Sequence, residues 1–181
     1  YGRAVREKNG NRYNYFPIGT AVASLPFVAL ANAFGFQMVE SEPLVQMVIA
    51  SISAALTVLL MVRIACLFVP VFRASLLAAV FFFGTSLAST CGTALWSHNF
   101  SALFALVAIY CVLLDMQKTR RYRWSVVAAC LFLSYLCRPN MALLSPALLL
   151  FYLSFSRKDA VYAGALVVLL VLGFAGFSLH E

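Results

Sequence analysis

The sequence predicts an all-α, polytopic integral membrane protein, a helix bundle that includes re-entrant or short hairpin helices. Hydrophobic residues make up 64% of the 181 residues and charged residues 10%, whereas soluble domains are typically about 45–50% apolar and about 25% charged. The apolar residues form runs close to the roughly 20 residues that a helix needs to cross a lipid bilayer. The net charge of +7 comes from short Lys/Arg segments between these runs, as in signals that orient membrane proteins. The sequence has no basic stripe interleaved with aromatic residues, so it does not favour a nucleic-acid partner.

The first half of the chain is predicted as part of one membrane domain. It begins with a polar loop over residues 1–15, followed by an apolar segment over residues 16–36. Prolines remove backbone donors and disturb a helix, so this second segment is predicted as a re-entrant or bent helix, and whether it spans the membrane stays open. It is interrupted at Pro17, Gly19, Pro26 and Gly35. Three membrane spans follow, predicted at about 44–62, 74–95 and 100–114.

The second half contains a long apolar segment, 125–155, interrupted by Arg138-Pro139-Asn140. Basic residues at 118–123 and 157–158 flank it, and the positive-inside rule places both flanks in the cytoplasm. The segment is therefore predicted as a hairpin of two short helices with its tip at the outer face. One kinked span stays open as the alternative. A last span is predicted at 160–179.

Arg138 is the first candidate for a binding residue. A permanent cation between two apolar runs is unfavourable unless it faces protein, water or an anion, and its planar guanidinium suits a phosphate. The alternative is an arginine whose side chain reaches the membrane interface. No acidic residue lies within the predicted spans, which disfavours a proton-coupled transporter.

Two other segments contain candidate residues. His98 lies where a predicted helix reaches the outer face, and its ring can hydrogen-bond a phosphate or a sugar. Trp96 beside it suits the membrane interface. The segment from Tyr13 through Pro17 to Gly19 enters a broken helix start, and helix starts expose N–H groups that can hold an anion. A solvated histidine and a plain membrane-entry segment are the alternatives.

These segments together resemble bacterial membrane glycosyltransferases of the GT-C superfamily. The resemblance is closest to the protein-mannosyltransferase-like or aminoarabinose-transferase-like kind. It rests on the order of NGNRYNYFPIGTAVASLPF, GTALWSHNFSALF and LFLSYLCRPNMALLSPALLLFYL. Each motif alone is degenerate, and Ser97 stands where a Gln is common. The matching positions are Tyr13, Pro17, Gly19, Pro26, Ala94, Leu95, Trp96, His98, Arg138 and Pro139.

The resemblance implies a function that composition does not. Such enzymes transfer a sugar from a polyprenyl-phosphate-linked donor to an acceptor at the outer face of the membrane, here the bacterial inner membrane. Arg138 and His98 would bind the donor phosphate, and Tyr13, Pro17, Gly19 and Trp96 would shape the cavity. No cofactor is predicted and no metal-binding residues are assigned. A non-enzymatic lipid-linked-sugar flippase or transporter stays open as the alternative.

The resemblance also implies that the catalytic base is an acidic residue in the first outer loop. We expect that loop upstream of Tyr1, because the sequence has the appearance of a fragment at both ends. The catalytic residue is therefore left unassigned, Glu7 is a poor substitute, and the piece alone is expected to be inactive. The sugar, the acceptor and the oligomeric state are not predicted.

Overall fold

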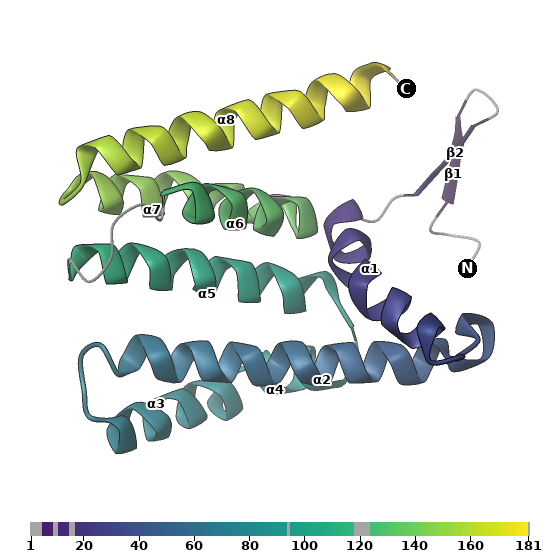
Figure 1. Cartoon of the computed structure of the whole chain (residues 1–181), viewed down its shortest axis with the longest axis horizontal. Helices are drawn as coiled ribbons and strands as arrows, with labels where there is room; N and C mark the ends of the chain where they lie inside the picture. Colours follow the sequence, from purple (N-terminus) through teal and green to yellow (C-terminus); the bar gives the residue numbers. More distant parts are fainter. Residues whose placement is uncertain (1–4, 9–10, 15–16, 94, 118–123, 181) are drawn as a thin grey trace.

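The computed structural model describes residues 5–8, 11–14, 17–93, 95–117 and 124–180. These residues are mainly helical, with one short β-hairpin near the N-terminus (Figure 1). Three of the helices are long and apolar enough to cross a membrane, at Glu40–Ala65, Ser97–Met116 and Arg157–Gly176. The predicted helical class is confirmed, and these three helices are candidates for membrane spans.

The N-terminal segment was expected to be an irregular loop, and it contains a hairpin instead. β1 (Val5–Lys8) pairs antiparallel with β2 (Asn11–Asn14), and Lys8 lies opposite Asn11. Two residues therefore connect the strands, Asn9-Gly10, which lie outside the described residues. Asn-Gly is the dipeptide that two-residue hairpin turns favour, which agrees with the pairing of β1 and β2.

α1 (Ile18–Ala33) is a single helix although Pro26 lies inside it. Pro17 precedes its first residue, and the fixed φ angle of proline suits this position. With 16 residues, α1 is about 24 Å long, which is shorter than the hydrocarbon core of a bilayer. It lies obliquely against one end of the other helices (Figure 1).

A tight turn joins α1 to the next helix. Gly35 adopts a left-handed φ of +82° and donates its N–H to Asn32 O at 3.0 Å. Phe36 N–H donates to Ala31 O at 3.1 Å. This pair of bonds is the Schellman arrangement, which satisfies the last carbonyl groups of a helix and favours glycine at the left-handed position.

α2 (Met38–Ala65) is the longest helix of the described chain. Its 28 residues correspond to about 42 Å, so it extends beyond the predicted span 44–62 at both ends. Glu40 lies in the first turn and Arg63 in the last, and both charges complement the helix dipole. The helix continues through Pro43 at the loss of one backbone hydrogen bond.

The predicted span 74–95 is wrong as a single helix. The structure has α3 (Val71–Gly84) and α4 (Leu87–Thr93), separated by a break at Thr85. Thr85 has extended backbone angles of −116° and 174°, and its Oγ1 accepts the N–H of Leu87 at 3.3 Å. The hydroxyl thus caps the start of α4. Hydropathy does not reveal this break, because both sides of it are apolar.

The second half consists of three short helices between two long ones. In this half, the predicted hairpin segment forms two short helices with a 3-10 helix between them, and the flanking helices are each longer than the predicted spans. The elements are α5 (Ser97–Met116), α6 (Trp124–Cys137), the 3-10 helix η1 (Pro139–Leu143), α7 (Leu144–Leu153) and α8 (Arg157–His180).

The two ends of the bundle differ in composition, and they are called the basic end and the α1 end. At the basic end lie the first turns of α3 and α8, with Arg73, Arg157 and Lys158 (Figure 1). At this end, Gln117 Nε2 after α5 donates a hydrogen bond to the carbonyl of Leu67, which follows α2, at 3.2 Å. At the opposite α1 end lie α1, the start of α5 and the junction between α6 and η1 (Figure 1). The chain enters α6 and leaves α7 at the basic end, so this segment returns to its starting side.

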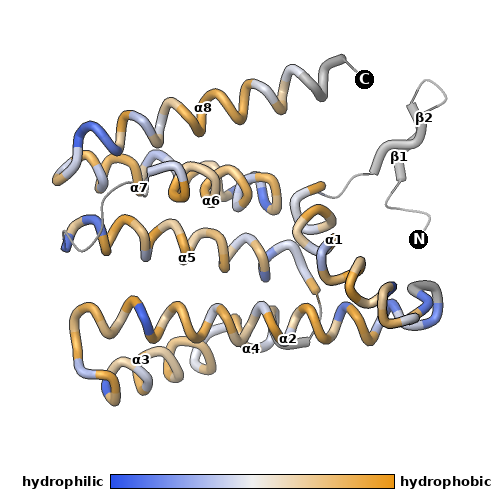
Figure 2. Tube along the Cα trace, in the orientation of Figure 1, coloured by the Kyte–Doolittle hydropathy of each residue, from blue (hydrophilic) through white to orange (hydrophobic). Residues whose placement is uncertain are grey.

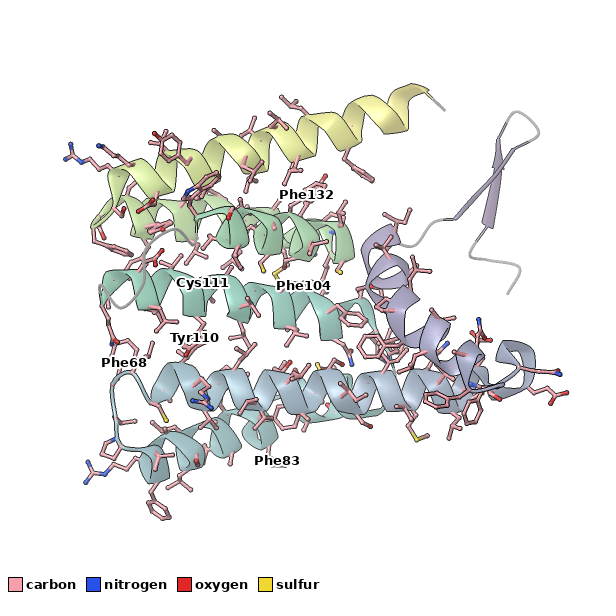
Figure 3. All side chains as sticks on the ribbon, in the orientation of Figure 1. Phe68, Phe83, Phe104, Tyr110, Cys111 and Phe132 are labelled. Carbon is pink, nitrogen blue, oxygen red and sulfur yellow. The ribbon has the colours of Figure 1, made fainter. Side chains whose placement is uncertain are left out.

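The helices pack through small residues and expose apolar ones. α5 packs extensively on α6 and also on α2; Figure 3 shows Phe104 and Cys111 on the α6 side of α5 and Tyr110 on the α2 side. Apolar residues cover the helices along most of their length (Figure 2), and Phe72 and Phe83 of α3 are 80% and 75% exposed. Bare apolar faces with small residues between the helices are typical of a bundle surrounded by lipid.

Candidate functional site

Arg138 lies at the α1 end, between α6 and η1. A residue that precedes proline is driven away from helical angles, and Arg138 is accordingly extended, with φ −153° and ψ 107°. α6 therefore ends at Cys137, and the chain turns around Arg138. The Arg138 N–H still donates to Ser134 O at 2.9 Å, and its carbonyl accepts Met141 N–H at 2.9 Å. Its side chain is half-buried at this turn.

His98 lies in the first turn of α5, and Asn99 holds that turn in place. Asn99 Oδ1 accepts the N–H of Trp96 at 3.2 Å, while Asn99 Nδ2 donates to Cys91 O at 2.9 Å and to Ser53 Oγ at 3.3 Å. Asn99 is only 1% exposed. One buried amide thus ties the start of α5 to α4 and α2, which fixes the backbone that bears His98.

The fold brings the segments that bear His98 and Arg138 together. Phe100, two residues after His98, and Cys137, next to Arg138, pack in one small core, and the charge of Arg138 acts on the imidazole. His98 Nδ1 is buried and has no hydrogen-bond partner among the described residues. Because a buried polar atom without a partner is unfavourable, this nitrogen is a group that a ligand or a water molecule would satisfy.

The first turn of α1 closes the third side of this cluster. Gly19 is buried, and a methyl group added to it would overlap the backbone of Leu136 and Cys137, with Leu136 O only 2.7 Å away. Thr20 Oγ1 lies next to the Cys137 thiol, and it is buried without a well-formed hydrogen bond to the rest of the described chain. A buried imidazole nitrogen and a buried hydroxyl oxygen therefore lie near the turn at Arg138.

The electrostatic character of this place is positive. α1 and α5 both begin here, and helix starts carry exposed N–H groups and partial positive charge. The helices around Arg138, namely α1, α6, η1 and α7, contain no acidic residue. Asp115 of α5 is 17 residues beyond His98, about 26 Å along the helix. Positive charge therefore predominates on these four helices.

An apolar groove of about 200 Å³ lies beside the cluster, between α1 and α2. Four of its wall residues, Phe27, Ala31, Val45 and Ile49, also pack in the small core that contains Cys137 and Phe100. Phe27 and Phe100 have ring centroids 6.3 Å apart. The same side chains therefore back the turn at Arg138 and line the groove, which is suited to a hydrocarbon chain.

The structure groups three of the six predicted site residues. Gly19, His98 and Arg138 meet around Cys137, whereas Pro17 marks the start of α1 and Trp96, 56% exposed, precedes α5. Tyr13 lies in β2, and its side chain is outside the described part of the structure. Sequence reasoning missed Thr20 and Asn99, because a single hydroxyl or amide in an apolar context has no motif. The only sequence signal for Asn99 was its position next to the candidate His98.

Comparison with known proteins adds no relative. The chain matches no protein-family model, no curated protein and no solved structure. The function of the cluster at Arg138 is therefore argued from its chemistry.

Proposed function

We propose that this chain is the donor-binding part of a membrane glycosyltransferase. The enzyme transfers a sugar from a polyprenyl-phosphate-linked donor to an acceptor at the outer face of the bacterial inner membrane. The observation that carries the proposal is that the start of α5, which bears His98, packs against the end of α6, next to Arg138, and that His98 Nδ1 is buried there without a hydrogen-bond partner among the described residues. The ordered motifs that resemble GT-C enzymes contain these same two residues.

The proposed role of Arg138 is to hold the donor phosphate. A guanidinium offers two parallel N–H donors to phosphate oxygens. When the bond between the anomeric carbon and the phosphate oxygen breaks, the electron pair stays on that oxygen, and negative charge grows on the leaving phosphate. A fixed cation at this position stabilises the transition state more than the ground state. His98 adds a second donor to the same phosphate.

The proposed place of the polyprenyl chain is the apolar groove between α1 and α2. A lipid phosphate has a charged head and a hydrocarbon tail, and here the positive cluster and the groove share wall residues. Transfer of the hydrocarbon tail from water or polar headgroups to this apolar surface lowers the free energy. The acceptor would need a general base, which is not assigned, so the proposal for this chain concerns the binding of the donor.

The test measures binding of polyprenyl phosphate, with polyprenol as the matched ligand without phosphate. The parent chain and the variants Arg138→Lys and Arg138→Gln are placed in lipid nanodiscs. Arg138→Gln should weaken binding of polyprenyl phosphate by about 10-fold or more, because a hydrogen bond to a charged group contributes about 1.5–3 kcal/mol. Arg138→Lys should be intermediate, because it keeps the charge and loses the paired donors. Binding of polyprenol should be unchanged.

The control is Arg73→Gln, which removes an exposed cation from the basic end. It should leave binding of both ligands unchanged. If Arg138→Gln binds polyprenyl phosphate as tightly as the parent, the phosphate site is wrong. A flippase is distinguished in the full protein: a transferase releases polyprenyl phosphate from the donor, whereas a flippase returns the donor intact.

A further inference from the structure

Two buried serines link α5 to α6 directly beneath the cluster at Arg138. Ser134 Oγ donates to the backbone carbonyl of Ser101 at 3.0 Å, and the two hydroxyl oxygens lie 3.4 Å apart. Both residues are at most 1% exposed. Their hydroxyls therefore bond across the helix interface and not to lipid or solvent.

These bonds differ from those of other serines in the chain. A serine in an apolar helix usually donates back to a carbonyl of its own helix. Ser24 donates to Thr20 O at 2.7 Å, and Ser53 to Ala50 O at 2.9 Å. Ser134 instead uses a carbonyl of the neighbouring helix, so its bond depends on how α5 and α6 are aligned.

The serine pair is one helical turn away from both His98 and Arg138. Ser101 follows His98 by three residues on α5, and residues three apart share one face of a helix. Ser134 precedes Arg138 by four residues and accepts its N–H through the backbone carbonyl at 2.9 Å. A slide or rotation of α6 against α5 would therefore break the serine bonds and move Arg138 relative to His98.

We propose that Ser101 and Ser134 are positioning residues that set the separation of His98 and Arg138. The core between α5 and α6 combines small side chains, such as Ala108 and Cys130, with larger apolar ones, such as Val112 and Leu131. Apolar contacts have little directional preference, so the serine hydrogen bonds add a preference for one register. The identity of the ligand rests on the proposed function, whereas the geometric claim does not.

The geometric test uses cross-linking. In a Cys66→Ala background, His98→Cys and Arg138→Cys are introduced together; the other four cysteines are buried. The rate of cross-linking by a short bifunctional thiol reagent then reports the separation. Ser134→Ala should slow the reaction most, because it loses both contacts to α5. Ser101→Ala should slow it less, because the bond from Ser134 to the Ser101 carbonyl remains.

The matched control is Thr57→Ala, which removes a buried hydroxyl that bonds within α2, to the carbonyl of Ser53. It should leave the cross-linking rate unchanged. Equal rates in the parent, Ser134→Ala and Thr57→Ala would overturn the proposal. If Ser134→Ala does not accumulate, the cross-linking rate of the milder variant Ser101→Ala is compared with those of the parent and the control instead, and equal rates would again overturn the proposal.

Binding is measured separately in chains that keep His98 and Arg138. Ser134→Ala should weaken polyprenyl phosphate binding by about threefold, the size expected for one interhelical hydrogen bond, and leave polyprenol binding unchanged. Slower cross-linking with unchanged binding would support the positioning role and count against phosphate as the ligand. The two proposals can therefore fail independently.

Discussion

At the scale of single residues, the hydrogen bond between Tyr152 and Asp115 is as informative as the cluster at Arg138. Tyr152 is fully buried, and its hydroxyl donates to Asp115 Oδ2 at 2.6 Å. Asp115 Oδ1 is also buried and has no hydrogen-bond partner in the described part of the chain. The phenol is thus the described group that satisfies this carboxylate, and it ties the end of α7 to the end of α5.

Replacing Tyr152 by Phe should destabilise the protein. The carboxylate would lose its donor in a low-dielectric place, which is expected to lower the free energy of unfolding by about 1–3 kcal/mol. Thermal unfolding in detergent measures the loss. Tyr162→Phe is the matched control: Tyr162 is 55% exposed and keeps its ring contact with Trp124 at 5.6 Å. Equal melting temperatures for the two variants would contradict the stabilising role of the buried hydroxyl.

At the scale of helices, the position of α1 depends on one close approach. Gly19 lets the first turn of α1 touch the last turn of α6, where any side chain would meet backbone atoms. Backbone atoms cannot rotate away as side chains do, so the contact requires glycine. α1 in turn covers the turn at Arg138 and forms one wall of the apolar groove.

Gly19→Ala should therefore displace α1. Overpacking of this kind typically costs about 1–3 kcal/mol, and we expect a lower melting temperature together with weaker binding of both polyprenyl phosphate and polyprenol. Gly164→Ala in α8 is the control, because its added methyl group would meet Leu149 at an ordinary 3.6 Å. That variant should be neutral or slightly stabilising, since alanine favours a helix. Normal binding by Gly19→Ala would show that α1 does not shape the site.

At the scale of the whole molecule, the described basic residues of α3 and α8 and the cluster at Arg138 lie at opposite ends of the bundle (Figure 1). By the positive-inside rule the basic end faces the cytoplasm, which would place the cluster at the outer face. Sidedness itself stays a prediction.

Cysteine accessibility in intact cells tests this orientation. In a Cys66→Ala background, Gln117→Cys and Ser156→Cys at the basic end should not react with a membrane-impermeant thiol reagent, whereas Asn140→Cys in exposed η1 should react. All three should react after permeabilisation. Labelling of Gln117→Cys or Ser156→Cys in intact cells would reverse the orientation or separate the two positions across the membrane.

The predictions made from sequence succeeded where a local property decides the structure. In a bilayer an apolar run satisfies its backbone by forming a helix, so α2, α5 and α8 were expected close to their observed places. The change of direction at Arg138-Pro139 was expected as well, because proline restricts the residue before it. The break at Thr85 was missed, since a hydroxyl that caps a helix leaves no mark in hydropathy.

The sequence by itself thus determined the helical membrane class, most of the helices and the identity of the isolated arginine. Only the tertiary structure decided that His98, Gly19 and Thr20 lie near the turn at Arg138, and that two serines form hydrogen bonds between α5 and α6. The physical reason is that these helices are apolar on all sides. A helix without an amphipathic stripe does not reveal which face is inward, so the pairing of faces follows from small residues and interhelical hydrogen bonds that become visible only when the helices are packed.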